Sequence, residues 1–277
     1  MAGVTAAALY RLSSFTHRPE GGNPAGVWIG DELPPRSEMQ RIAAEVGFSE
    51  TAFVAPATGF RRTIRYYSPE AEVLFCGHAT IATGVLLGDR DGAGLYTLST
   101  AVGDVPVDVR NGQAALTSVT PSHEIASDAL LDEILDSLRW SRRDLDPSIP
   151  SARANGGVWH FVIAAASRDR LARLEYDFDA LKETMLRENL TTIQLIYRES
   201  KTLFHSRNPF PVGGVVEDPA TGAAAAALGG YLRDARLIEV PATIEIRQGE
   251  DMGRPSLITV DIPRSGGIVV KGGAVVI

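Results

Sequence analysis

The stretch that decides the fold reads His78-Ala79-Thr80-Ile81-Ala82-Thr83-Gly84-Val85-Leu86-Leu87, with Gly88 directly after it. A helix of this sequence carries apolar side chains on nearly every side instead of along one stripe. Such a helix must be buried all round, which predicts a central helix surrounded by a sheet. Gly88 stands where a glycine often ends a helix, so we expect the helix to stop there.

The segments around this helix predict the sheet, because they are short and rich in β-branched or aromatic residues. The strands expected in the first half are residues 8–15, 27–29, 51–55, 62–67, 95–100, 105–109 and 114–119. A further helix is expected from Ser37, where Gln40 completes a capping box and apolar residues recur at helical spacing.

The second half follows the same logic. Its expected helices are residues 128–139 and 178–187, its expected strands are 160–165, 192–197, 203–206, 243–247, 257–262 and 268–277, and residues 223–232 form a second segment that is apolar nearly all round. A length of 277 residues exceeds the usual single domain. Because Pro121 suggests a boundary, we expect one domain over residues 1–120, completed by 267–277, and another over 121–266. The fold class is α+β, in two similar halves.

An internal repeat supports this division. Moving the chain along itself by 142 positions superimposes Arg65 on Arg207 and Pro69 on Pro211, ahead of the two apolar helices. The same offset aligns Val73 with Val215, Cys76 with Asp218, Ala82 with Ala224 and Leu86 with Leu228. Identical residues at one fixed offset are the signature of duplicated units.

Duplication gives each half a turn that leads into the N-terminus of an apolar helix. The turns read Phe75-Cys76-Gly77-His78 and Glu217-Asp218-Pro219-Ala220-Thr221-Gly222. The first N–H groups of a helix have no partner within it, and its dipole favours negative charge there. Two such termini facing one another across a cleft would hold a carboxylate, so the expected partner is a small organic acid.

Composition excludes several classes of function. The formal net charge is −7, and no run of Lys or Arg exceeds two residues, which argues against nucleic-acid binding. One cysteine cannot form an intrachain disulfide, and no CxxC, HExxH, GxGxxG or Walker pattern predicts a metal or cofactor. Without a basic leader or a long apolar run, the chain is expected to be cytoplasmic and not membrane-bound.

Five segments carry a resemblance to a known family. They are Gly22-Asn23-Pro24-Ala25, Ser49-Glu50-Thr51-Ala52-Phe53-Val54, Cys76-Gly77-His78-Ala79-Thr80, Glu217-Asp218-Pro219-Ala220-Thr221-Gly222 and Gly253-Arg254-Pro255-Ser256. In this order they resemble the PhzF-like (phenazine-biosynthesis) family from about residue 8 to the C-terminus. The resemblance implies a diaminopimelate-epimerase-like fold, with a barrel-like sheet around a central helix in each domain, and commonly a homodimer. It also implies a cofactor-independent isomerase of a biosynthetic pathway.

The resemblance places the family's general acid/base at Glu50. This residue directly precedes an apolar strand, so its carboxylate is expected to be half buried, and burial raises a carboxylate pKa toward the working pH. The repeat places Thr192 opposite Glu50, so the base is not duplicated. His78 and Asp218 line the pocket by resemblance, although a structural histidine and a helix cap are the ordinary roles of such residues.

Substrate binding is expected from backbone N–H groups of Gly77, Thr221, Gly222 and Ala223, with the side-chain amide of Asn23 added. The family usually has Ser where this chain has Ala223, so a hydroxyl is lost while the backbone donor remains. This difference leaves the substrate of the founding enzyme in doubt for this chain.

Cys76 relates the chain to diaminopimelate epimerases, which use one cysteine from each half. The second half offers Asp218 instead, which excludes a symmetric pair of thiols and favours Cys76 as a buried packing residue. Two other functions stay open. One is a non-catalytic, protein-binding member of the family, and the other is an epimerase or racemase of an amino-acid-like substrate.

Overall fold

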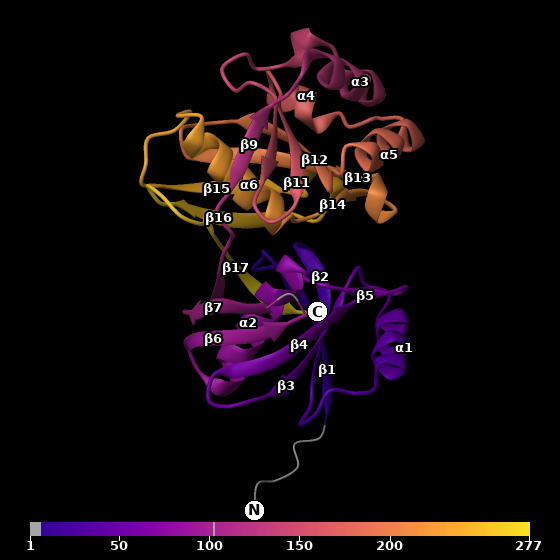
Figure 1. The fold of residues 1–277 in the computed structure, drawn as a ribbon, viewed down its shortest axis with the longest axis vertical. Helices are drawn as coiled ribbons and strands as arrows, with labels where there is room; N and C mark the ends of the chain where they lie inside the picture. The colour runs from indigo at the N-terminus through magenta and orange to yellow at the C-terminus, as the bar shows by residue number, and fades with distance from the viewer. Residues whose placement is uncertain (1–6, 102) are drawn as a thin grey trace, which may run out of the picture. The chain divides into compact units, whose positions relative to one another are not determined.

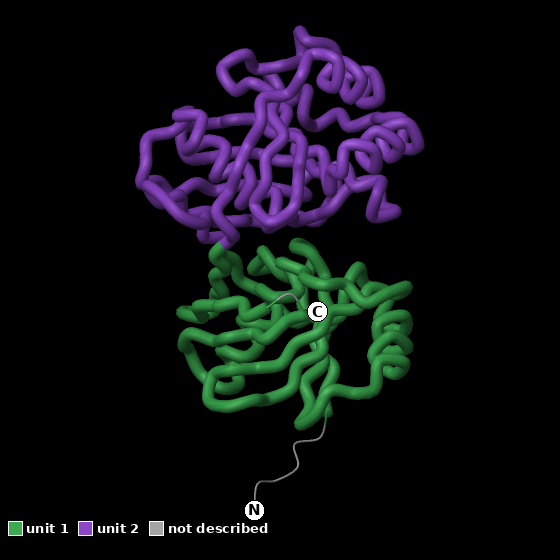
Figure 2. The backbone as a smooth tube through the Cα atoms, in the orientation of Figure 1, with its two compact units in different colours: residues 1–117, 271–277 green, residues 118–270 purple. Residues whose placement is uncertain are grey.

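The computed structural model describes residues 7–101 and 103–277 (Figure 1). They divide into two compact units, residues up to 117 with 271–277, and residues 118–270 (Figure 2). In the part of the chain that is described, no helix combines the length and the apolar character that crossing a membrane requires.

Eight strands of the first unit pair in a closed ring. Its order is β1 (Ala8–Ser14), β2 (Asn23–Ile29), β3 (Thr51–Pro56), β4 (Arg61–Tyr67), β6 (Gly94–Thr100), β7 (Gly103–Arg110), β8 (Gln113–Thr117) and β17 (Val269–Val276), which pairs again with β1. The pairs β2–β3 and β4–β6 are parallel. A short strand, β5 (Glu72–Val73), pairs with β4.

Helix α2 (Gly77–Asp91) fills this ring. Every residue from His78 to Leu87 is buried, and the helix contacts β1, β2, β3, β7 and β8. The prediction of a central helix surrounded by a sheet is therefore confirmed. Outside the ring, α1 (Arg36–Val46) packs Met39 and Ala43 against Phe53 of β3 and Tyr67 of β4.

Two predicted helix ends are wrong. Helix α2 continues past Gly88 to Asp91, with Gly92 as its C-cap. Gly88 serves packing instead, because a Cβ atom there would lie 2.4 Å from Cγ1 of Val109 and only a glycine lets β7 pass so closely. Helix α1 begins at Arg36 with no side-chain cap. Gln40 does not close a capping box, since its Nε2 donates to the carbonyl of Ser68 at 2.9 Å.

The second unit surrounds α6 (Gly222–Asp234) in a similar way. Its sheet runs β9 (Ser122–Ile125), β10 (Ala152–Asn155), β11 (Trp159–Ala164), β12 (Thr192–Arg198), β13 (Leu203–Phe210), β15 (Ala242–Gln248) and β16 (Ser256–Ile262), with β14 (Val215–Asp218) on β13. The sequence did not predict the short strands β5, β9, β10 and β14.

Helices cover the outside of this second sheet. They are α3 (Asp128–Leu138), α4 (Arg168–Ala172) and α5 (Phe178–Arg187), and 3-10 turns lie at η1 (Arg142–Asp144), η2 (Pro211–Gly213) and η3 (Glu250–Met252). Leu135 and Met185 are among the residues that form a core with the strands beneath.

The two units repeat one strand pairing in detail. Phe53 faces Arg65 across β3 and β4, and Leu195 faces Arg207 across β12 and β13, so both members of the pair are displaced by 142 positions. The parallel pairs β2–β3 and β4–β6 recur as β11–β12 and β13–β15. The predicted α+β fold of two similar halves, each a sheet around a central helix, is confirmed.

The close packing of Gly88 against β7 can be tested by adding a side chain at residue 88. Gly88→Leu forces a side chain into Val109, and overpacking of this kind lowers the free energy of unfolding by about 3 kcal/mol. Asp89→Leu is the control, because its exposed position in the same helix should change stability by no more than about 0.5 kcal/mol. Equal unfolding curves in urea for the two variants would contradict the packing argument.

Candidate active site

Glu50 and His78 meet within the first unit. Glu50 directly precedes β3, and its carbonyl accepts a hydrogen bond from the N–H of Gly26 on β2 at 3.1 Å, which fixes the backbone. His78 is the second residue of α2. Oε2 of Glu50 lies 3.4 Å from Nε2 of His78, with the two side chains 20% and 10% exposed. A carboxylate and an imidazole at this distance can share or pass a proton.

Two further side chains, those of Cys76 and Ser49, contact the imidazole of His78. Sγ of Cys76 lies 3.4 Å from Nδ1 of His78, and Oγ of Ser49 lies 3.4 Å from Nε2. Cys76 is buried, as expected, but it contacts the imidazole instead of serving only to pack the core. The contact of Ser49 was not predicted, although its neighbour Glu50 was assigned a role.

A buried hydroxyl chain holds the start of α2. The Thr80 hydroxyl donates to the carbonyl of Cys76 at 2.6 Å, so the Tyr66 hydroxyl, also 2.6 Å from Thr80, is the donor to Thr80. Burial raises the pKa of Tyr66, which keeps the phenol protonated for this role. The side chain of the N-cap residue Cys76 makes no capping hydrogen bond to the helix. The first turn of α2, with Gly77, thus has N–H groups that no capping side chain accepts, and such groups favour a negative charge.

Asn23 begins strand β2 and is buried. Its carbonyl accepts from Oγ of Ser14 at 3.1 Å. Gly22 precedes it with φ of +74°, and a Cβ there would lie 2.4 Å from the carbonyl oxygen of Ser14. The turn therefore needs glycine, and it leads directly into Asn23, three residues before Gly26, whose N–H is bonded to the Glu50 carbonyl.

Asp218 and Thr221 lie together in the second unit. The Thr221 hydroxyl donates to Oδ2 of Asp218 at 2.6 Å. The N-cap residue of α6 is Thr221. Asp218 therefore does not occupy the N-cap position, which was the ordinary structural role considered for it. Gly222 and Ala223 begin α6, and both residues are partly exposed.

Gln248 is a residue that sequence reasoning missed. This buried side chain at the end of β15 donates to the carbonyl of Asp218 at 2.7 Å and accepts from the N–H of Thr221 at 3.1 Å. Gly249 follows with φ of +75°, and a Cβ there would lie 2.8 Å from the carbonyl oxygen of Pro219. The late glycine-containing segment thus supports the loop before α6, a contact that no local pattern reveals.

The structure places the expected site residues in two groups. Glu50, His78 and Gly77 belong to the first unit with Asn23, whereas Asp218, Thr221, Gly222 and Ala223 belong to the second. That both helix N-termini hold one substrate carboxylate remains a prediction of the sequence.

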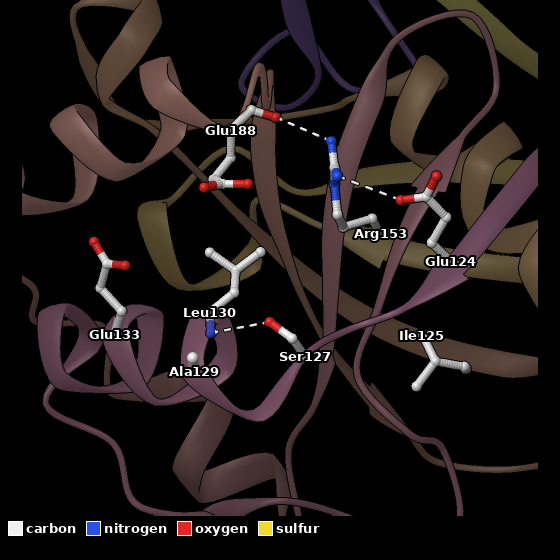
Figure 3. Close-up of a pocket in the computed structure, with 8 residues that line it drawn as sticks. All are labelled: Glu124, Ile125, Ser127, Ala129, Leu130, Glu133, Arg153 and Glu188. Atoms are coloured by element: carbon white, nitrogen blue, oxygen red, sulfur yellow. Dashed lines mark hydrogen bonds and ion pairs between the residues drawn. The ribbon is translucent and has the colours of Figure 1, made fainter.

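A separate depression of about 380 Å³ lies in the second unit (Figure 3). Glu133 contributes to its lining, and Arg153 is engaged with Oε2 of Glu124 at 3.3 Å and with the carbonyl of Glu188 at 3.1 Å. None of the predicted site residues lines it. Its acidic lining is also the opposite of what a carboxylate substrate needs.

Comparison with known proteins gives a consistent result. The family model of the phenazine biosynthesis-like proteins, PhzC-PhzF, matches residues 12–277. The chain belongs to this family. The trans-2,3-dihydro-3-hydroxyanthranilate isomerase of Pseudomonas fluorescens is 32% identical over 254 residues, covering 89% of this chain and 87% of that protein. An uncharacterised isomerase of Bacillus subtilis is 26% identical and covers 95% and 93%.

Solved structures agree. A phenazine biosynthesis protein of the PhzF family from Bacillus anthracis has a TM-score of 0.86 at 25% identity, covering 99% of this chain and 98% of that one. A probable proline racemase from Agrobacterium radiobacter has a TM-score of 0.65 at 13% identity, covering 99% and 91%, and shows the shared fold. The predicted PhzF-like family and the isomerase class are both confirmed.

The support from Gln248 can be tested with Gln248→Leu. The variant leaves the Thr221 N–H and the Asp218 carbonyl without this partner, which costs about 1–3 kcal/mol of unfolding free energy. Gln113→Leu, at an exposed position of β8, is the control and should change stability little. If the two variants unfold alike on heating, the role given to Gln248 is wrong.

Proposed function

We propose that this PhzF-family isomerase moves a proton between two carbons of a small carboxylate-bearing substrate without a cofactor, and that Glu50 is the acid/base. The observation that carries the proposal is the mostly buried Glu50 carboxylate, 3.4 Å from His78 in the first turn of the apolar central helix. A general base must lie where the substrate is held, and a helix N-terminus favours the substrate's anionic group.

In the proposed reaction Glu50 takes a proton from one carbon and the electron pair of that C–H bond shifts the double bond. The same carboxyl then returns its proton to a second carbon, so atoms and electrons balance without an oxidant. His78 orients Glu50 and can exchange a proton with it. Proton transfer by one positioned carboxylate typically accelerates such a step by about 10²- to 10⁴-fold.

The second unit offers no counterpart of Glu50, which supports the proposal of a single catalytic base. Thr192, which the repeat places opposite Glu50, is buried and bonded to Nδ1 of His160 at 2.8 Å and to Nδ2 of Asn208 at 3.1 Å. Burial lowers the pKa of His160 to about 3, so this imidazole is neutral at physiological pH. Neither Thr192 nor a neutral, buried His160 replaces a carboxylate, which disfavours a symmetric two-base racemase.

Substrate binding is assigned by the same proposal. Asp218 with Thr221, the first-turn N–H groups of Gly77, Gly222 and Ala223, and the amide of Asn23 are the proposed contacts. The relative from Pseudomonas fluorescens is named for an amino-substituted cyclic acid. For this chain we propose a small acid of that general kind in a biosynthetic pathway, a homodimeric state and a cytoplasmic location.

The acid/base assignment is tested by proton NMR in deuterium oxide, with cyclic and amino-substituted carboxylic acids as substrates. Glu50→Gln should lower the rate of exchange and turnover by at least about 10²-fold, because the amide cannot take the proton. Substrate binding and thermal stability should persist.

Glu32→Gln is the matched control, since Glu32 is exposed and should exchange at the wild-type rate. Turnover retained in Glu50→Gln would contradict the assignment. A wild-type protein that binds members of the panel without exchanging any proton would favour a non-catalytic family member.

The binding role of Gly77 is tested with Gly77→Ala. An added Cβ there meets no heavy atom of the described structure within 4 Å, so stability should change by no more than about 0.5 kcal/mol. The methyl group would instead narrow the space above the helix N-terminus. We expect KM for the carboxylate substrate to rise severalfold with kcat less affected, and an unchanged KM would refute the role.

A further inference from the structure

Three different metal-binding side chains converge in the first unit. Glu50, Cys76 and His78 each offer one ligand atom, and these atoms lie within 4.8 Å of one another. Among the described residues they are the one group of three or more such side chains that meets this distance. A thiolate, an imidazole and a carboxylate are the donors that zinc binds in proteins.

The distances between the ligand atoms approach those around a tetrahedral ion. Zinc bonds of about 2.0 Å to nitrogen and oxygen and about 2.3 Å to sulfur place neighbouring ligand atoms roughly 3.3 to 3.6 Å apart. Nε2 of His78 lies 3.4 Å from Oε2 of Glu50 and 3.9 Å from Sγ of Cys76, which is itself 3.4 Å from Nδ1. The three ligand atoms lie within 4.8 Å of one another, and because Sγ is nearer Nδ1 than Nε2, the imidazole must turn about its side-chain bonds for all three to reach one ion.

The backbone already holds the ligands in place. Cys76 and His78 begin the buried helix α2, and the carbonyl of Cys76 is fixed by the hydroxyl of Thr80. The main chain of the third ligand is anchored because the Glu50 carbonyl accepts from the N–H of Gly26. Ligands ordered in advance lose less entropy on binding an ion.

We propose that Glu50, Cys76 and His78 form a binding site for Zn²⁺. The ion would have three protein ligands and a fourth position for water or a substrate carboxylate, the arrangement of an open zinc site. On binding, the Cys76 thiol releases its proton to solvent, and no oxidation or reduction occurs. The soft sulfur and the imidazole select against Mg²⁺ and Ca²⁺, which prefer oxygen ligands.

Zinc binding and proton transfer exclude one another at this site. A Glu50 carboxylate that coordinates the ion cannot take a proton from carbon, so Zn²⁺ inhibits the isomerase. This inhibition rests on the proposed function of Glu50, whereas the binding of zinc does not.

The site is tested by titrating the full-length protein, first stripped with EDTA, with Co²⁺ as a spectroscopic substitute for Zn²⁺. We expect about one equivalent to bind, with a thiolate-to-cobalt absorption band that Zn²⁺ then removes. Cys76→Ser should lose the absorption band. Both Cys76→Ser and His78→Gln should weaken Zn²⁺ binding by more than about a hundredfold, which exceeds the loss typical of a residue that only hydrogen-bonds to a metal ligand. His17→Asn, an exposed histidine of the same unit, is the control and should bind as wild type.

Each outcome is decisive for one claim. A missing band, or a band that survives in the folded Cys76→Ser variant, overturns the site. If Cys76→Ser does not fold, the loss of binding in His78→Gln decides. Activity of the EDTA-stripped protein is measured separately, so an inactive protein that still binds one zinc contradicts the proposed function and not the metal site.

Discussion

The structure depends on the burial of two apolar helical segments, residues 78–87 and 224–233, inside their own sheets. Residues His78 to Leu87 of α2 are buried, and the ring of eight strands closes around them. A helix enclosed in this way has little freedom to slide or turn, since interiors are close-packed. Its first turn is consequently held in place, and that turn carries His78 and the N–H groups on which the proposed chemistry relies.

Duplication supplied two such helices, and the two halves then diverged. Glu50 in the first half corresponds to Thr192 in the second, and Cys76 corresponds to Asp218. The second half fills the position with a buried network of His160, Thr192 and Asn208 in place of a partly exposed acid. A buried polar group must be paired, so this network stabilises the position that corresponds to the proposed acid/base of the first half.

The sequence predicts the central elements well, because an all-round apolar segment and a fixed repeat offset are strong signals. It misses β5, β9, β10 and β14, whose two to four residues are too few to show a period of two. The sequence predicts the end of α2 at Gly88, which is wrong because Gly88 packs against β7 and does not end the helix. The contacts of Gln248 and the grouping of Glu50 with Cys76 and His78 join residues far apart in the sequence, which no local spacing rule can reveal.

The turns before the two helices differ in how tightly they are held. Arg207 forms a buried, two-pronged ion pair with Glu217, with Nε 2.9 Å from Oε2, and also donates to the carbonyl of Ala172 at 2.6 Å. Its counterpart Arg65 reaches Glu72 only at 3.9 Å and is partly exposed. Removing one partner of a buried pair is costly, whereas an exposed pair contributes little. The loop before α6 is therefore fixed by charge and by Gln248. The turn before α2 rests on Tyr66 and Thr80, close to the three side chains to which we assign proton transfer and ion binding.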